Sequence, residues 1–257
     1  MALKTFFLLT IGQCVAAGQL VAAVDASILD GVGYPCLSCP QWQLRALVRL
    51  GLTLAFLSTR IADLCAAAVM LCALIYRDLI FAQAQLRRAL VTFFVLLLAM
   101  LVVRVLFTKF ISAQGLQHAS PSVHLGGGFQ LSAAFPWMEQ FFEIKDRSSR
   151  SFPGDHASVL LLWVTFLSVF SKGKQRVLVC LTGLFFILPR LIAGAHWLSD
   201  NLVGGGFVVL QTLAWGYCSI FGDKLYQLLE RLAKPVLRAL QYLPLINKFS
   251  IVRQIRR

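Results

Sequence analysis

Apolar and polar positions follow one another in long blocks along this chain. Five blocks are apolar for about the length of a membrane span, at 61–77, 89–112, 157–171, 177–193 and 201–221. A helix crosses a bilayer with roughly 20 apolar residues, so the shorter blocks need flanking residues. A further apolar stretch, 5–24, is either a first span or a signal peptide. Its glutamines favour the span, because they weaken a signal core.

This pattern predicts an all-α fold, a polytopic membrane helix bundle with about six transmembrane spans. Hydrophobic residues make up 58% of the chain and charged residues 14%, which is too apolar for a soluble protein. We find no internal repeat, and the interpretation is a single integral-membrane domain over 1–257.

Basic residues in short connections predict the orientation. They gather in 77–88, in 172–176 and in the tail 222–257, all on one side of a six-span arrangement. By the positive-inside rule this side is cytoplasmic, so 222–257 is a basic cytoplasmic tail. The loops 113–156 and 194–200 then face outward, which in a bacterial inner membrane is the periplasm.

The net charge of +13 has two interpretations. It reflects positive-inside topology and attraction of the tail to anionic lipid headgroups, or outward basic residues collect a polyanionic lipid. Nucleic acid is excluded as a partner, because no basic run is interleaved with aromatic residues on a soluble module.

Two outer segments are expected to lie at the membrane surface. Residues 44–57 form an apolar stretch with two arginines, and 113–156 contains an aromatic run, so each is expected to contain an interfacial helix. Cys36 and Cys39 lie in the outer loop before these segments. A local disulfide is expected there, since further metal ligands are missing from the sequence around them.

The candidate chemistry lies in two motifs, Ser151-Phe-Pro-Gly-Asp-His156 and Pro189-Arg190-x5-His196-x3-Asp200. His196 and Asp200 share a face if this segment is helical. A carboxylate that holds one ring nitrogen leaves the other free as a nucleophile. A His-Trp pair at the end of a span is otherwise an interfacial anchor.

Arg190, Gly154 and His156 complete a set suited to phosphoryl transfer. A guanidinium is the best bidentate partner for phosphate oxygens, although a lone arginine at a span end also reaches lipid headgroups. The amides around Gly154 and the following helix N-terminus favour an anion. His156 is placed to protonate a leaving oxygen. Alone, it is also explained as a solvated loop histidine.

These residues resemble the signature of the type 2 phosphatidic acid phosphatase (PAP2) superfamily. That signature has a Lys…Arg-x-Pro-like segment, Pro-Ser-Gly-His and Ser-Arg-x5-His-x3-Asp. The third part is matched from Pro189 to Asp200 with Pro for Ser, and the second is Pro153-Gly-Asp-His156. Together with Lys145-Asp146, these motifs look like the lipid A 1-diphosphate synthase branch.

The first part of the signature is changed in this chain. His118-Ala-Ser-Pro121 resembles the Arg-Ala-Ser-Pro segment of that branch, with His in place of Arg. Lys109 precedes His118 by nine positions, whereas the signature has seven. The resemblance assigns His118 and Lys109 to phosphate binding. Arg104, Arg147 and Arg150 are the alternatives for the missing charge.

The resemblance implies a phosphotransferase that moves a phosphoryl group from undecaprenyl diphosphate to lipid A 1-phosphate through a phosphohistidine. His196, Asp200 and His156 are then catalytic, and Arg190, Lys109, His118, Gly154 and Arg150 bind substrate phosphate. No cofactor or metal is expected. The alternatives are a lipid phosphate phosphatase that uses water, a lipid-binding or transport protein, and a structural subunit. The sequence does not indicate an oligomeric state.

Overall fold

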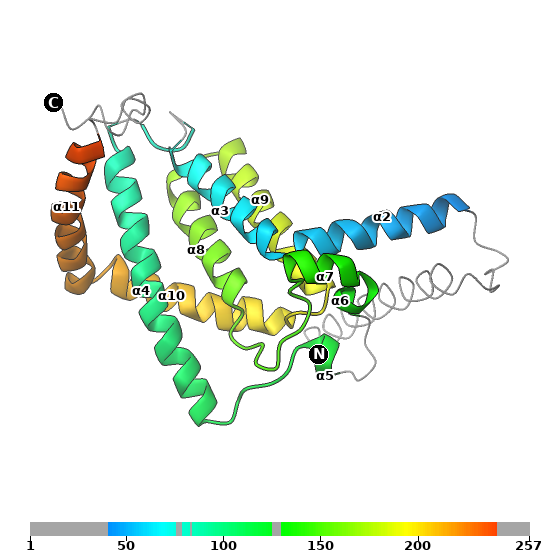
Figure 1. The fold of residues 1–257 in the computed structure, drawn as a ribbon. Coiled ribbons are helices and arrows are strands. Elements are labelled where there is room, and N and C mark those ends of the chain that lie inside the picture. The colour runs from blue at the N-terminus through cyan, green and yellow to red at the C-terminus, as the bar shows by residue number, and fades with distance from the viewer. Residues whose placement is uncertain (1–40, 76–78, 83, 125–129, 241–257) are drawn as a thin grey trace. The chain divides into compact units, whose positions relative to one another are not determined.

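The regular structure is helical throughout the described part of the chain. A computed structural model describes residues 41–75, 79–82, 84–124 and 130–240, and each regular element in these ranges is a helix (Figure 1). The expected all-α class is therefore confirmed. The stretch 5–24 and the Cys36–Cys39 pair lie outside the described residues, so both of those predictions stay open.

Four of the expected spans correspond to helices whose bounds lie within a few residues of the prediction. They are α3 (Arg60–Ile75), α4 (Leu86–Ala113), α8 (Asp155–Phe170) and α9 (Lys174–Ile192). α4 and α9 are long and apolar enough to cross a membrane, and α8 is a shorter apolar helix. The total of six spans stays a prediction.

The span expected over 201–221 is not one unbroken helix. This stretch contains a π-helical turn η1 (Asp200–Gly205), then α10 (Gly206–Gly216), then a break before α11 (Ile220–Leu240). The helices before and after the break are bent by 74°. A Cβ on Gly222 would lie 2.2 Å from the Gly216 carbonyl oxygen, so the turn requires glycine at 222. The bent pair is a third candidate span only if it is counted as one.

Two compact units make up the structure, and each is described by itself. The first unit comprises Met1–Ala66, Gln117–Gly154 and Leu184–Leu202, and the second comprises Ala67–Leu116, Asp155–Gly183 and Val203–Arg257. In the second unit α4 packs against α10 and α11, and α8 packs against α10. The buried Trp163 donates from its indole to the Met70 carbonyl at 3.2 Å, which joins α8 to α3.

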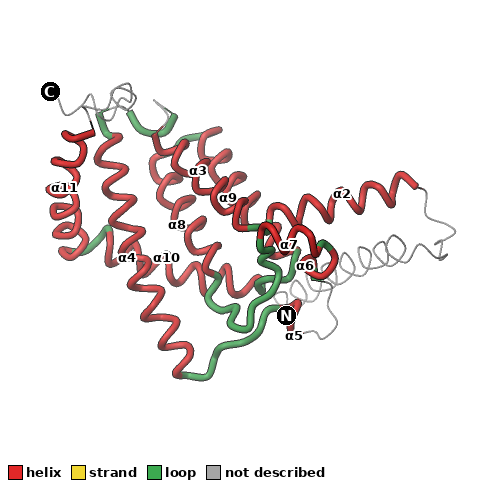
Figure 2. The backbone as a smooth tube through the Cα atoms, viewed as in Figure 1, coloured by secondary structure: helices red, strands yellow, loops and turns green. Residues whose placement is uncertain are grey.

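The first unit contains the outer loop that the sequence placed at the membrane surface. α2 (Gln41–Leu57) covers the expected 44–57 helix, and the loop forms α5 (Pro121–His124), α6 (Leu131–Ala134) and α7 (Pro136–Phe142). Its apolar core joins α2, α6, α7 and the residue after α9, and consists of Ala55, Leu131, Met138, Ile144 and Ala193. Residues 143–154 after α7 are loop (Figure 2) and carry much of the candidate site.

Candidate active site in the first unit

His196 is held by a backbone carbonyl. Its Nδ1 lies 3.0 Å from the Ser151 carbonyl oxygen, whereas the nearest Asp200 oxygen is 3.9 Å away, beyond hydrogen-bond distance. A carbonyl only accepts, so this contact requires the proton on Nδ1. The neutral ring then carries its lone pair on Nε2. The sequence assigned this orienting contact to Asp200 alone and missed Ser151.

Ser151 also connects His196 to the first motif. The Ser151 amide donates to the His118 carbonyl at 3.0 Å, and its hydroxyl lies 3.3 Å from the same oxygen. The fully buried Ser151 thus binds the segments of both His118 and His196, which lie far apart in the sequence. Since the carbonyl of any residue type accepts in this way, the side-chain pattern carried no signal for it.

Asp200 is fully buried and shared among several groups. Its Oδ2 accepts from the Trp197 amide at 2.9 Å, and its Oδ1 lies 3.3 Å from His118 Nε2. Residues 196 and 197 are not helical, so the condition under which 196 and 200 would share a helix face is not met. The Asp200 carboxylate still lies near the His196 ring, because it accepts a hydrogen bond from the amide of the next residue, Trp197.

The turn after α9 brings the histidine into position. Gly194 has a φ of +73°, a conformation that favours glycine. The Ala195 amide returns to the Arg190 carbonyl at 3.0 Å, which closes the C-terminus of α9. The Gly194 carbonyl accepts from the Ser122 amide at 3.2 Å, where a side chain at 194 would crowd Ser122. The indole of Trp197 donates to the Ala119 carbonyl, so this residue has an internal partner.

Arg190 is buried, with 8% of its surface exposed, and it forms an ion pair. Its Nη2 lies 2.7 and 2.6 Å from the two oxygens of Asp63 on α3. The sequence placed Arg190 at the site but did not single out Asp63. A signal was available, because an acidic residue inside an expected span is a functional candidate by default.

The other basic residues considered for phosphate binding, as assignments or as alternatives, lie in both units. Lys109 is exposed on α4 in the second unit, where Arg104 pairs with Asp155 at 2.6 Å. In the first unit Arg147 lies 3.7 Å from Glu139, and Arg150 is exposed. Within the described ranges, the guanidinium of Arg150 has no ion-pair partner. His118 is half-exposed, and its Nε2 lies 3.3 Å from Asp200, so it is the first-motif candidate that the structure brings to this carboxylate.

Gly154 is used differently from the sequence prediction. Its amide donates to the Asp200 carbonyl at 3.1 Å, so the amide expected to face phosphate is engaged within the protein. A Cβ at this position would lie 2.2 Å from Asn201 Oδ1 and 3.3 Å from the Asp200 carbonyl. The absence of a side chain at 154 therefore lets this loop pack directly against the Asp200 backbone.

We expect Gly154→Ala to lower both stability and activity. Asn201 is buried, so its side chain has little room to move, and overpacking of this kind costs about 1–3 kcal/mol. Thermal unfolding and initial rates measure the two effects. Gly115→Ala is not a suitable control because of its positive φ; Gly206→Ala has open space around its Cβ and is expected to behave like wild type. Unchanged activity in Gly154→Ala would contradict the packing argument.

His156 lies in the first turn of α8, in the second unit, and is partly buried. Its proposed partnership with His196 therefore stays a prediction from the motif. Among the described residues, no group of three or more His, Cys, Asp or Glu side chains is placed to hold a metal ion.

Comparison with known proteins identifies related sequences. The sequence model of the PAP2 superfamily matches residues 88–221. A curated relative, lipid A 1-diphosphate synthase from Escherichia coli (strain K12), is 32% identical over 87 residues. That alignment covers 34% of this chain and 37% of the relative, so it spans about a third of each protein. No solved structure matches the chain.

Proposed function

The chain belongs to the PAP2 superfamily, whose sequence model matches more than half of it, and from this premise we propose that it transfers phosphoryl groups between lipids. Membership confirms the resemblance drawn from the motifs and the expected class of enzyme, a lipid phosphatase or phosphotransferase. The specific reaction we propose moves a phosphoryl group from undecaprenyl diphosphate to lipid A 1-phosphate, giving lipid A 1-diphosphate. The partial similarity to lipid A 1-diphosphate synthase supports this choice.

The observation that carries the proposal is the His196 ring with its Nδ1 on the Ser151 carbonyl. With the proton on Nδ1, the neutral ring keeps its lone pair on Nε2, which is the atom a nucleophilic imidazole needs. The nearby Asp200 carboxylate stabilises the positive charge that develops on the ring when Nε2 bonds to phosphorus.

In the proposed first step, His196 Nε2 attacks the terminal phosphorus of the diphosphate. A P–N bond forms and the bond to the bridging oxygen breaks, so undecaprenyl phosphate leaves. His156 gives the leaving oxygen its proton, the role assigned from its motif. Arg190 stabilises the charge on the phosphoryl oxygens.

In the second step, an oxygen of lipid A 1-phosphate attacks the phosphohistidine and the P–N bond breaks. His156, now neutral, accepts the acceptor's proton if the attacking group carries one. Water in place of the lipid would make the protein a phosphatase. We place the site on the periplasmic face of a bacterial inner membrane, as the distribution of basic loops predicts.

The test uses the full chain, purified and reconstituted with undecaprenyl diphosphate labelled in its terminal phosphate. Label is expected to move to lipid A when lipid A 1-phosphate is present. Label released only as inorganic phosphate, with or without that lipid, would replace the transferase with a phosphatase. No turnover of the donor under either condition would contradict the proposed function itself.

His118 stands where the signature of the resembling branch has arginine, and this difference makes a separate prediction. We expect His118→Arg to retain or raise activity, because a permanent cation would face phosphate near the buried Asp200. His118→Ala is expected to weaken substrate use by about 1–3 kcal/mol, the cost of one polar hydrogen bond. Initial rates against donor concentration measure both. Complete loss in both variants would assign His118 a specific catalytic role.

A further inference from the structure

Arg190 is a buried cation whose hydrogen-bonding capacity is only partly used. Asp63 contacts it through one nitrogen, Nη2, which lies 2.7 and 2.6 Å from the two carboxylate oxygens. A fork-to-fork pair would instead use two guanidinium nitrogens. The Nε of Arg190 is buried and has no hydrogen-bond partner in the described part of the chain. A buried N–H without a partner is costly unless a ligand completes it.

Asp63 is itself held in place at the start of α3. The Lys145 amide donates to the Ser58 carbonyl at 2.9 Å, and Thr59 forms an isolated bridge with Ile144. Both Ser58 and Thr59 are fully buried. These backbone contacts join the segment before α3 to the loop after α7. They set the position from which the first turn of α3 directs Asp63 toward Arg190.

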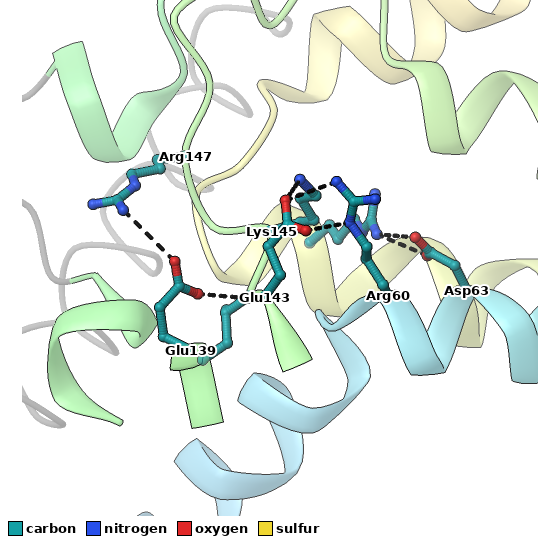
Figure 3. A network of polar contacts seen from close by, with 8 residues as sticks. Arg60, Asp63, Glu139, Glu143, Lys145 and Arg147 are labelled. Carbon is teal, nitrogen blue, oxygen red and sulfur yellow. Dashed lines mark hydrogen bonds and ion pairs between the residues drawn. The ribbon is translucent and has the colours of Figure 1, made fainter. Parts of the chain in front are cut away.

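The same turn of α3 carries a second ion pair that serves as a comparison. Arg60 and Lys145 both contact Glu143 (Figure 3), and the Arg60 Nη2 lies 2.9 Å from Glu143 Oε1. The hydrogen bonds from Lys145 and Arg60 lower the pKa of Glu143. The side chains of Arg60 and Glu143 are 64% and 46% exposed, so solvent screens this pair and it contributes little. In the Arg190–Asp63 pair the arginine side chain is only 10% exposed, while Asp63 is 37% exposed.

We propose that Asp63 is a positioning residue for phosphoryl transfer, acting through Arg190. Its carboxylate balances the buried guanidinium and leaves the Nε edge to donate to an oxygen of the transferred phosphoryl group. This inference rests on the proposed function. It extends the site beyond the residues matched by the PAP2 sequence model, because α3 precedes residue 88.

The simplest alternative is that the pair only stabilises the fold. A structural role and a positioning role differ in what they do to ligands of the site. If Asp63 orients Arg190, loss of Asp63 weakens the binding of an anion that resembles the transferred phosphoryl group, and it also lowers kcat. If it only stabilises the fold, the folded fraction of the variant keeps wild-type values.

The experiment measures hydrolysis of an aryl phosphate and its inhibition by orthovanadate, using the full chain. Asp63→Asn is expected to lower kcat and to weaken vanadate inhibition, each by about 10- to 100-fold, the range found for residues that orient metal ligands. Asp63→Glu restores the charge and is expected to recover part of both. Thermal unfolding of each variant reports how much protein is folded. Glu143→Gln is the matched control, with rates and inhibition expected near wild type.

A double-mutant cycle decides whether Asp63 acts through Arg190. Arg190→Ala removes the group to be positioned, so adding Asp63→Asn to it is expected to lower the rate by less than about twofold. Two results would overturn the inference: folded Asp63→Asn with wild-type kcat and vanadate inhibition, or an equal loss in the Arg190→Ala background. Should Asp63→Asn fail to fold, Asp63→Glu in the same cycle gives the same decision. A wild-type protein that neither hydrolyses the aryl phosphate nor transfers phosphate contradicts the proposed function instead.

Discussion

His196→Ala is expected to abolish phosphoryl transfer together with covalent labelling of the protein. The proposed reaction requires a bond between Nε2 of this residue and phosphorus, and alanine offers no nucleophile. Loss of a nucleophile from an enzyme that works through a covalent intermediate lowers turnover by about 10⁴-fold or more. The Ser151 carbonyl that accepts from Nδ1 is a backbone group, so the loop around it is expected to persist.

Quenched-flow labelling with the donor alone measures this result. Wild type is expected to carry acid-labile, base-stable phosphate, as for a phosphohistidine, and His196→Ala is expected to carry none. His124→Ala is the matched control, because it removes an exposed imidazole from the same unit. The ring centroid of His124 lies 6.2 Å from that of Trp197. Label that survives in His196→Ala would move the nucleophile to His156 or eliminate the covalent route.

Asp200→Asn is expected to lower kcat by about 10²- to 10³-fold while the fold is retained. Asparagine keeps an oxygen that accepts from the Trp197 amide, the 2.9 Å contact of the wild type. It loses the negative charge that lies 3.9 Å from His196 Nδ1. Such a charge is worth about 4 kcal/mol at an effective dielectric near 20, and every 1.4 kcal/mol changes a rate tenfold.

The size of this effect separates two roles for Asp200. If its carboxylate alone set the tautomer, as in carboxylate-oriented triads, the loss would be about 10⁴-fold. Because the Ser151 carbonyl at 3.0 Å already requires the proton on Nδ1, we expect the smaller value. Single-turnover kinetics measure the rate of the variant, and circular dichroism shows whether its fold is retained. If Asp200→Asn lowered the single-turnover rate as much as His196→Ala does, Asp200 would be the group that sets the tautomer of His196.

The helices that depend on local sequence were well predicted. The apolar blocks 89–112 and 177–193 correspond to α4 and α9, because a continuous apolar run and its polar flanks set both the length and the ends of a helix. The block 201–221 was also apolar, yet it breaks after Gly216. The close approach of Gly222 to the Gly216 backbone is a feature of the turn between the two helices, and hydropathy contains no information about it.

The candidate site divides in the same way. Motif spacing identified Arg190, His196 and Asp200, and in the first unit His196 lies beside the buried Asp200, whereas the side chain of Arg190 pairs with Asp63. The motif did not identify the partners of two of them. Asp63 pairs with Arg190 across 127 positions, and the Ser151 carbonyl holds His196 across 45.

The sequence by itself determined the helical class and, through the resemblance of its motifs, the superfamily, and it supplied the candidate side chains for the chemistry. The helical class follows from composition and apolar run length, and the candidates follow from residue spacing, all of which are local properties of a chain. Only the tertiary structure decided that a backbone carbonyl accepts a hydrogen bond from His196 Nδ1, that the Gly154 amide is already engaged, and that Asp63 pairs with Arg190. Each of these depends on which polar groups are buried together, because a buried donor or charge takes whatever partner the fold brings within reach.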